Sequence, residues 1–214
     1  MRLHTYFRSS AAYRVRIALN LKGLDYEAVP VHLVRGGGEH RQPAYLGLNP
    51  AGLVPALEDQ GQVLTQSLAI VEYLEEIHPR PALLPEAPLD RARVRAIAQA
   101  IACDIHPVNN LRVLQYLTRE LAADDAQKNA WYRHWVGVGM QAVEAMLAAD
   151  ARTGAFCHGD APGLADCCLV PQVFNARRFG CELSAMPTVL RIADHCAGLE
   201  AFRRAAPEAQ PDAE

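Results

Sequence analysis

Four prolines within ten residues divide this chain into two parts with different sequence patterns. They are Pro79, Pro81, Pro85 and Pro88. Proline fixes φ and lacks the N–H group that a helix interior or a central strand needs, so this stretch forms neither. Before it, short apolar segments alternate with short helical ones, and after it apolar residues recur at helical spacing as far as about Arg204. We therefore expect two domains, residues 1–80 and 90–214, joined by a linker over residues 81–89.

The first part reads as strand–helix–strand followed by strand–strand–helix. Strands are predicted at residues 2–7, 26–33, 54–58 and 63–64, and helices at residues 11–22, 42–48 and 68–77. The strand at residues 54–58 contains Pro55, which favours an edge position in the sheet. Ser67 is expected to cap the helix that follows it. This order is the thioredoxin-like arrangement, in which the first strand–helix turn and the loop before the third strand meet at one edge.

The second part is predicted to be all-α, so the fold class is an α/β thioredoxin-like domain plus an all-α domain. His106-Pro107 interrupts the first long helical pattern and should kink it. Residues 164–174 are very apolar and predict a central helix. Gly163 stands at the start of that helix, and Asp166 is expected to reach back to the backbone there. The residues after Pro207 are expected to be disordered.

The composition excludes several classes of protein. The chain has 214 residues and a formal net charge of -3, so no broad basic surface for nucleic acid is expected. No apolar run is long enough to span a membrane and no signal-peptide pattern is present, which favours a cytoplasmic protein without a membrane partner. The six cysteines include no Cys-x-x-Cys pair and no spacing typical of zinc ligands. We therefore expect free, mostly buried thiols and no metal.

The turn before the first helix carries the strongest chemical signal. Ser9 or Ser10 can cap that helix, and Arg8 directly precedes the two serines. A hydroxyl, a helix N-terminus and a guanidinium then lie close together, which suits an anion such as a thiolate. A serine that only caps a helix would explain the same segment.

Several motifs together resemble the zeta class of glutathione transferases, a group that includes maleylacetoacetate isomerases. They extend from Leu3 to Pro211 and comprise Arg8-Ser9-Ser10, Leu48-Asn49-Pro50, Val54-Pro55, Gln66-Ser67, Gly159-Asp160, Leu169-Val170-Pro171-Gln172-Val173 and Arg178-Phe179. One position departs from the pattern of the class, because Ala11 stands where a cysteine usually follows the two serines. The turn therefore has no thiol of its own, and a sulfur nucleophile must come from a cosubstrate.

The resemblance implies a glutathione site in the first domain. Ser9 is the first choice for orienting the glutathione sulfur, and Ser10 assists it. A cis peptide bond at Val54-Pro55 would turn the backbone groups of Val54 outward, toward the cysteinyl part of glutathione. Gln66 and Ser67, at a helix start, would hold the γ-glutamyl carboxylate. An ordinary edge-strand proline and a simple helix cap are the structural alternatives.

The resemblance also implies a site for the substrate. Arg8 and Arg178 are candidates for binding its carboxylates, since guanidinium binds carboxylate in bidentate fashion. Asn109 would contact substrate oxygens, and His106 the substrate or glutathione, although a histidine beside proline is more often structural. Asp104 would contact glutathione across the interface of a homodimer. The remaining arginines are expected to be solvated or in ion pairs: Arg14, Arg16, Arg91, Arg93 and Arg177.

The function implied by the resemblance is glutathione-dependent cis–trans isomerisation of a small dicarboxylic keto acid. The first expectation is conversion of maleylacetoacetate to fumarylacetoacetate in aromatic amino-acid breakdown. Maleylpyruvate isomerisation is the close alternative, and the apolar Leu111 favours the longer acetoacetate substrate over it. Conjugation or dehalogenation of small α-halo acids and a non-catalytic glutathione-binding module are further alternatives.

Overall fold

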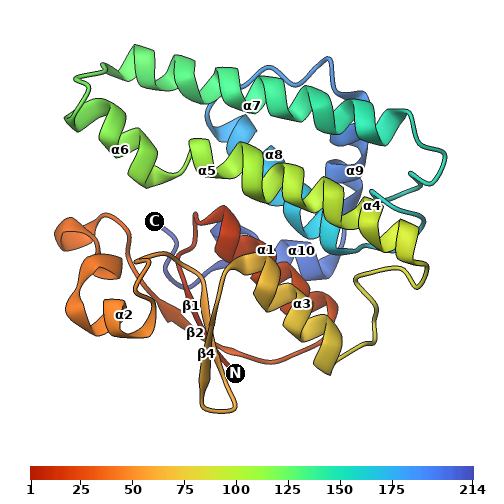
Figure 1. Cartoon of the computed structure of the whole chain (residues 1–214), viewed down its shortest axis with the longest axis horizontal. Coiled ribbons are helices and arrows are strands. Elements are labelled where there is room, and N and C mark those ends of the chain that lie inside the picture. The colour runs from red at the N-terminus through yellow and green to blue at the C-terminus, as the bar shows by residue number, and fades with distance from the viewer. The chain divides into compact units, whose positions relative to one another are not determined.

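The chain forms two compact units in a computed structural model that describes all residues from 1 to 214. The first unit is Met1–Leu83 together with Gly198–Glu214, and the second is Leu84–Ala197. In Figure 1 the first unit is red to yellow, with the blue end of the chain added to it. The predicted domain limits place this last segment with the helical domain instead.

The first unit contains one four-stranded sheet in the order β2-β1-β3-β4. The strands are β1 (Arg2–Thr5), β2 (Glu27–Pro30), β3 (Ala56–Asp59) and β4 (Gln62–Thr65). β1 pairs with β2 in parallel and with β3 antiparallel, and β3 pairs antiparallel with β4. The prediction that the third strand lies at an edge is wrong, because β4 folds back and covers its outer side. Pro55 is tolerated because it lies just before β3, outside the ladder.

Helices complete the first unit: α1 (Ser10–Leu21), α2 (Pro43–Leu48), α3 (Ser67–Ile77), α10 (Glu200–Ala205) and the short turns η1 (Arg35–Gly37), η2 (Glu39–Arg41) and η4 (Pro207–Ala209). α1 begins after Ser9 and ends at Leu21, with Lys22 as its C-cap and Gly23 in the left-handed region at φ 65° as the sequence predicts. α3 begins one residue earlier than predicted. Gln66 is its cap residue and Ser67 is already helical, so Ser67 is not the cap.

Arg16 is buried in the centre of the first unit and makes no ion pair there. Its Nη1 donates to Thr5 Oγ1 at 2.9 Å and to Tyr6 O at 3.3 Å. Its Nη2 donates to Phe7 O and its Nε to Ala205 O, both at 2.9 Å. The expectation of a solvated or ion-paired Arg16 is therefore wrong. Desolvation by burial lowers the pKa of its guanidinium to about 10.

The segment after Pro207 is ordered, which contradicts the expected disorder. Gln210 is buried, and its Nε2 donates to two backbone carbonyl groups at 2.9 Å each. Asp212 Oδ2 accepts a hydrogen bond from Phe7 N at 3.0 Å. Polar composition suggested a free tail, but these side chains satisfy backbone groups of the first unit instead.

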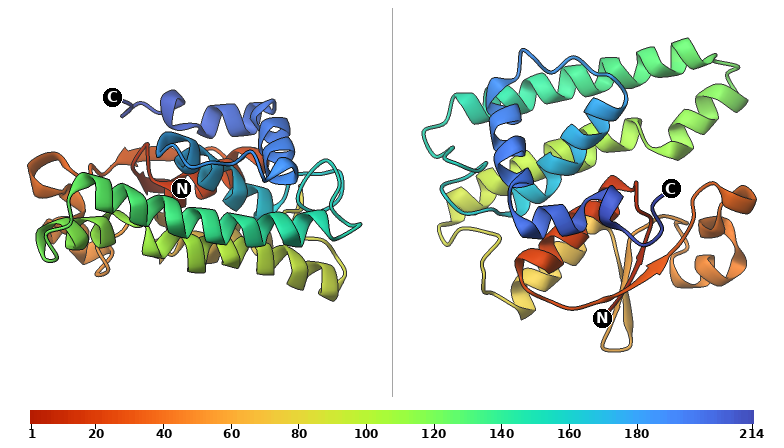
Figure 2. Two further views of the ribbon diagram at one scale, coloured as in Figure 1. Left: turned by 90° about the horizontal axis from the view of Figure 1, so that it is seen from above. Right: turned by 180° about the vertical axis from the view of Figure 1, so that it is seen from behind.

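The second unit is all-helical, as predicted. Its helices are α4 (Pro88–Gln99), the π-helix η3 (Ala100–Ile105), α5 (His106–Val108), α6 (Leu111–Arg119), α7 (Asp125–Ala148), α8 (Leu164–Arg178) and α9 (Pro187–Ala197). The interruption predicted at His106-Pro107 is confirmed, since a π-helical stretch precedes it and α6 starts afresh after its cap Asn110. α8 contacts α4 and α9 (Figure 2). Cys167 and Cys168 on α8 are fully buried. None of the helices combines the length and apolarity that crossing a membrane requires.

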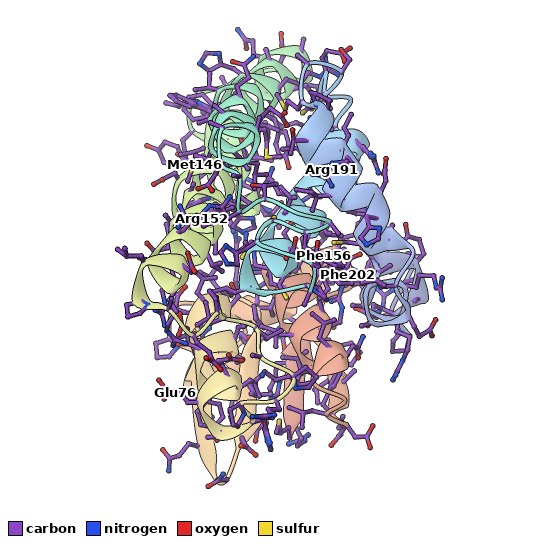
Figure 3. All side chains as sticks on the ribbon, turned by 90° about the vertical axis from the view of Figure 1, so that its right-hand side faces the viewer. Glu76, Met146, Arg152, Phe156, Arg191 and Phe202 are labelled. Atoms are coloured by element: carbon purple, nitrogen blue, oxygen red, sulfur yellow. The ribbon has the colours of Figure 1, made fainter.

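Charged side chains hold the loop between α7 and α8 (Figure 3). Arg152 in this loop pairs with Asp90 of α4 at 2.9 Å. Arg93 of α4 pairs with Asp150 at 2.7 Å, so its expected ion pair is confirmed. Arg191 of α9 donates to a loop carbonyl group at 2.9 Å. The loop that leads into the central helix is thereby attached to two other helices.

The start of α8 depends on one buried carboxylate. Asp166 Oδ1 accepts from Cys157 N and its Oδ2 from Gly163 N, both at 2.9 Å. The predicted reach of Asp166 back to the helix start is confirmed. Desolvation raises the pKa of this carboxyl group, while the hydrogen bonds from the two N–H groups oppose that rise.

We expect Asp166→Ala to lower the free energy of unfolding by about 3 kcal/mol, because two buried N–H groups lose their acceptor. Urea denaturation followed by circular dichroism measures this loss. Asp194→Ala is the matched control, since Asp194 is exposed and pairs only with the exposed Arg177. The control should cost less than about 1 kcal/mol. Equal losses in the two variants would contradict the role given to Asp166.

Candidate functional site

The turn between β1 and α1 has the geometry that an anion-binding helix start requires. Ser9 is the cap residue of α1, and its Oγ accepts from Ala12 N at 3.2 Å. A hydroxyl group that accepts one hydrogen bond still has its own hydrogen to donate. Ser9 can therefore cap the helix and bind an anion at the same time. Ser10 is the first residue of α1 and is buried.

Arg8 is held beside this turn by two aromatic residues. Its Nη2 donates to the hydroxyl of Tyr6 at 2.9 Å. Its guanidinium carbon lies 4.7 Å from the ring centroid of Phe7 and 5.8 Å from that of Tyr6. Such cation–π contacts restrict the guanidinium without neutralising its charge. Arg8 is thus a cation in a defined place next to Ser9.

The peptide bond between Val54 and Pro55 is cis, as the resemblance predicted. The carbonyl group of the preceding Leu53 accepts from Tyr45 Oη and from Asn49 Nδ2, both at 2.7 Å. These two donors fix the backbone that leads into Val54. Sequence analysis gave Tyr45 and Asn49 no role, although Asn49 lies within one of the quoted motifs.

The start of α3 lies next to a buried arginine. Gln66 has φ 68°, a left-handed conformation that is unfavourable for a residue with a side chain. Ser67 Oγ accepts from Arg14 Nη1 at 3.2 Å. Arg14 is 2% exposed, so the expectation that it is solvated is wrong. In the sequence, the position of Arg14 between apolar neighbours could have indicated this burial. A guanidinium and a helix N-terminus together suit a carboxylate.

One apolar cluster underlies both the Ser9 turn and the Val54 loop. Its buried members are Tyr6, Phe7, Val31, Tyr45 and Val54. Tyr6 and Phe7 belong to the turn, while Tyr45 and Val54 belong to the loop side. Because these side chains pack together, the turn and the loop are kept in a fixed relation within the first unit.

The other predicted site residues belong to the second unit. Asp104 is exposed on η3 and His106 begins α5. Asn109 follows α5 and is buried, and its Oδ1 makes no hydrogen bond. Arg178 ends α8, exposed, with its guanidinium carbon 5.0 Å from the ring centroid of Phe179. Asp104, His106 and Asn109 thus lie on one short stretch, and Arg178 lies on a different helix.

The first unit, which contains the Ser9 turn, has no cysteine. All six cysteines lie in the second unit, and Cys157, Cys167, Cys168 and Cys196 are buried. Desolvation raises the pKa of the Cys157 and Cys196 thiols, which keeps them protonated and unreactive. Within the first unit, only a bound molecule could provide a thiolate to the Ser9 turn.

Comparison with known proteins identifies the family. Residues 8–77 match the model of the glutathione S-transferase N-terminal domain. A Pseudomonas aeruginosa protein named maleylacetoacetate isomerase is 55% identical over 99% of this chain and 98% of its own length. A solved structure described as a holo maleylpyruvate isomerase, a bacterial zeta-class glutathione S-transferase, is 51% identical over all of both chains, with a TM-score of 0.97.

A second solved structure was determined with small molecules bound. It is described as a maleylacetoacetate isomerase from Methylobacterium extorquens AM1 with malonate and glutathione. It is 43% identical over all of both chains, with a TM-score of 0.96. The sequence identity holds at this level over the full length, and the thioredoxin-like sheet and the Ser9 turn agree with it. The chain belongs to the glutathione S-transferase family, and within it to the zeta class.

Proposed function

We propose that this protein is a glutathione-dependent cis–trans isomerase that converts maleylacetoacetate to fumarylacetoacetate. The observation that carries the proposal is the placement of Ser9 at the start of α1 with Arg8 held beside it. This arrangement suits a thiolate and a carboxylate at the same turn. The Pseudomonas aeruginosa relative named maleylacetoacetate isomerase supports the choice of substrate.

The residues of the first unit fit glutathione. Its γ-glutamyl carboxylate suits the start of α3, where Gln66 and Ser67 lie and the Arg14 guanidinium is 3.2 Å from Ser67 Oγ. Its cysteinyl backbone suits the Val54 peptide groups before the cis-Pro55, in the manner of strand addition. With these two parts bound, the thiol of glutathione is assigned to the Ser9 turn. The first unit thus offers hydrogen-bonding groups for the γ-glutamyl carboxylate, the cysteinyl backbone and the thiol.

Bound glutathione supplies a thiolate that adds to the conjugated double bond, permits rotation about it and leaves again, so glutathione is not consumed. Ser9 donates a hydrogen bond to the sulfur, with Ser10 assisting, and the N-terminus of α1 favours the negative charge. Both effects lower the pKa of the thiol. Arg8 binds a substrate carboxylate and holds it while the double bond turns.

Four residues of the second unit have proposed roles of their own in binding ligand. Arg178 binds the second carboxylate, and the amide of Asn109 donates to a substrate oxygen, which stabilises charge that develops there. His106 binds glutathione. Asp104 contacts glutathione of the neighbouring subunit in a homodimer. These roles follow from the family resemblance and define a small dicarboxylic keto acid as the ligand.

Maleylpyruvate is the second candidate substrate, and the solved relative described as a maleylpyruvate isomerase supports it. The two acids share the maleyl end. Leu111 offers an apolar side chain where an arginine would add another carboxylate anchor, which favours the longer acetoacetate chain. A cytoplasmic enzyme of phenylalanine and tyrosine breakdown is the setting that the first substrate implies.

An isomerase assay tests the proposed reaction directly. We expect purified protein with far less glutathione than substrate to convert all the maleylacetoacetate, and to do so faster than it converts maleylpyruvate. Ultraviolet spectroscopy follows the acids, and a thiol titration at the end measures remaining glutathione. Consumption of one glutathione per turnover, or loss of halide from an α-halo acid as the main reaction, would replace isomerisation with conjugation or dehalogenation.

Ser9→Ala should lower kcat by about 10²-fold, because removing one positioned donor to a developing or fixed anion costs on this order. The ultraviolet absorbance of bound thiolate, measured against pH, should show a higher pKa for glutathione on this variant. Ser184→Ala is the control, since Ser184 is exposed in the second unit. A normal rate and a normal thiol pKa in Ser9→Ala would move the role to Ser10 or to the helix N-terminus alone.

A further inference from the structure

We propose that Asp212 is a positioning residue, whose carboxylate sets the orientation of the Arg8–Ser9 turn by holding the backbone of Phe7. This role rests on the proposed function of Ser9 in orienting the glutathione sulfur. Asp212 lies far along the chain from the turn, in the segment after α10, but within the same compact unit. In Figure 1 the marked C end lies beside the red turn that precedes α1.

The turn itself leaves one backbone group in need of a partner. Ser9 N donates to Tyr6 O at 2.9 Å, so Phe7 and Arg8 are the two central residues of a β-turn. The N–H group of the first central residue has no acceptor within such a turn. Asp212 Oδ2 accepts from Phe7 N at 3.0 Å and so fills that place.

Opposite charges therefore hold both sides of Phe7. Asp212 binds its N–H group, while Arg16 Nη2 donates to its carbonyl oxygen at 2.9 Å. Hydrogen bonds to charged groups are stronger than those between neutral groups. Together they restrict rotation of the two peptide planes that set the direction of Arg8 and Ser9. Loss of the Asp212 bond frees one of these planes.

The side chain of Asp212 is half-buried, with its carboxylate turned partly into the first unit. Its Oδ1 is buried and makes no hydrogen bond, so placing it here costs free energy. The nearby charge of Arg16 offsets part of that cost, because the guanidinium and the carboxylate attract each other. A half-buried carboxylate that accepts from a backbone N–H group at the proposed binding turn, and leaves its other oxygen unpaired, indicates a positioning role.

The segment that carries Asp212 is attached on both sides of it. Gln210 binds two carbonyl groups at 2.9 Å each, before Asp212 in the chain. Glu214, after it, contacts Arg35 and lies 3.4 Å from His32 Nε2. Asp212 is thus presented to Phe7 by an anchored segment, which keeps its carboxylate in one place.

Three variants separate positioning from charge and from stability. Asp212→Ala removes the acceptor and the charge, Asp212→Asn keeps an acceptor oxygen without the charge, and Glu208→Ala removes an exposed acid of the same segment. The measurements are hydrogen exchange of the turn amides without ligand, the pKa of bound glutathione from thiolate absorbance, and kcat and KM. Thermal unfolding monitors stability.

For Asp212→Ala we expect faster exchange at residues 7–10, a thiol pKa higher by about one unit and a kcat about tenfold lower, since one unit corresponds to a tenfold change. KM for the acid should change little. Asp212→Asn should stay within about twofold of the wild type in kcat, because the hydrogen bond to Phe7 N survives. Glu208→Ala should match the wild type in all measurements.

Two results would overturn the proposal. A normal thiol pKa and kcat in Asp212→Ala, with only the unfolding temperature lowered, would make Asp212 a structural contact. Equal defects in the Ala and Asn variants would assign the effect to charge and not to the hydrogen bond. If the wild type binds glutathione but isomerises neither acid, the proposed function fails, while amide exchange and thiolate absorbance still decide the role of Asp212.

Discussion

The buried guanidinium of Arg16 is the interaction on which the first unit depends. It binds the end of β1 through Thr5 and Tyr6, the following turn through Phe7, and the end of α10 through Ala205. Segments that are distant in sequence thus share one donor. A fully buried charge is costly unless its N–H groups are hydrogen-bonded, and here the Thr5 hydroxyl and the carbonyl groups of Tyr6, Phe7 and Ala205 accept them.

Around the proposed glutathione site, side-chain hydrogen bonds fix the backbone at two places. Arg16 and Asp212 hold Phe7, and Tyr45 and Asn49 hold the carbonyl group of Leu53. None of these contacts involves an atom proposed to touch ligand. They fix the neighbouring groups that are proposed to touch ligand. The site therefore has its geometry before the ligand binds, and binding does not have to order it.

Much of the fold was predictable because its signals are local. The strand–helix order, the Ser9 cap, the Gly23 end of α1, the break near His106 and the reach of Asp166 all depend on neighbours within a few residues. Three of the errors share one cause. They concern features that depend on other parts of the chain. β3 is an interior strand because β4 pairs with it, and Arg14 and Arg16 are buried because their partners lie far along the chain.

The sequence by itself determined the class of fold, the residues at the helix start and the absence of a thiol at the turn, since each is written in short motifs. Only the tertiary structure decided that Arg14 lies beside Ser67 and that Asp212 returns to Phe7. The physical reason is that such hydrogen bonds join residues far apart in the chain, and no local pattern encodes which distant group completes them.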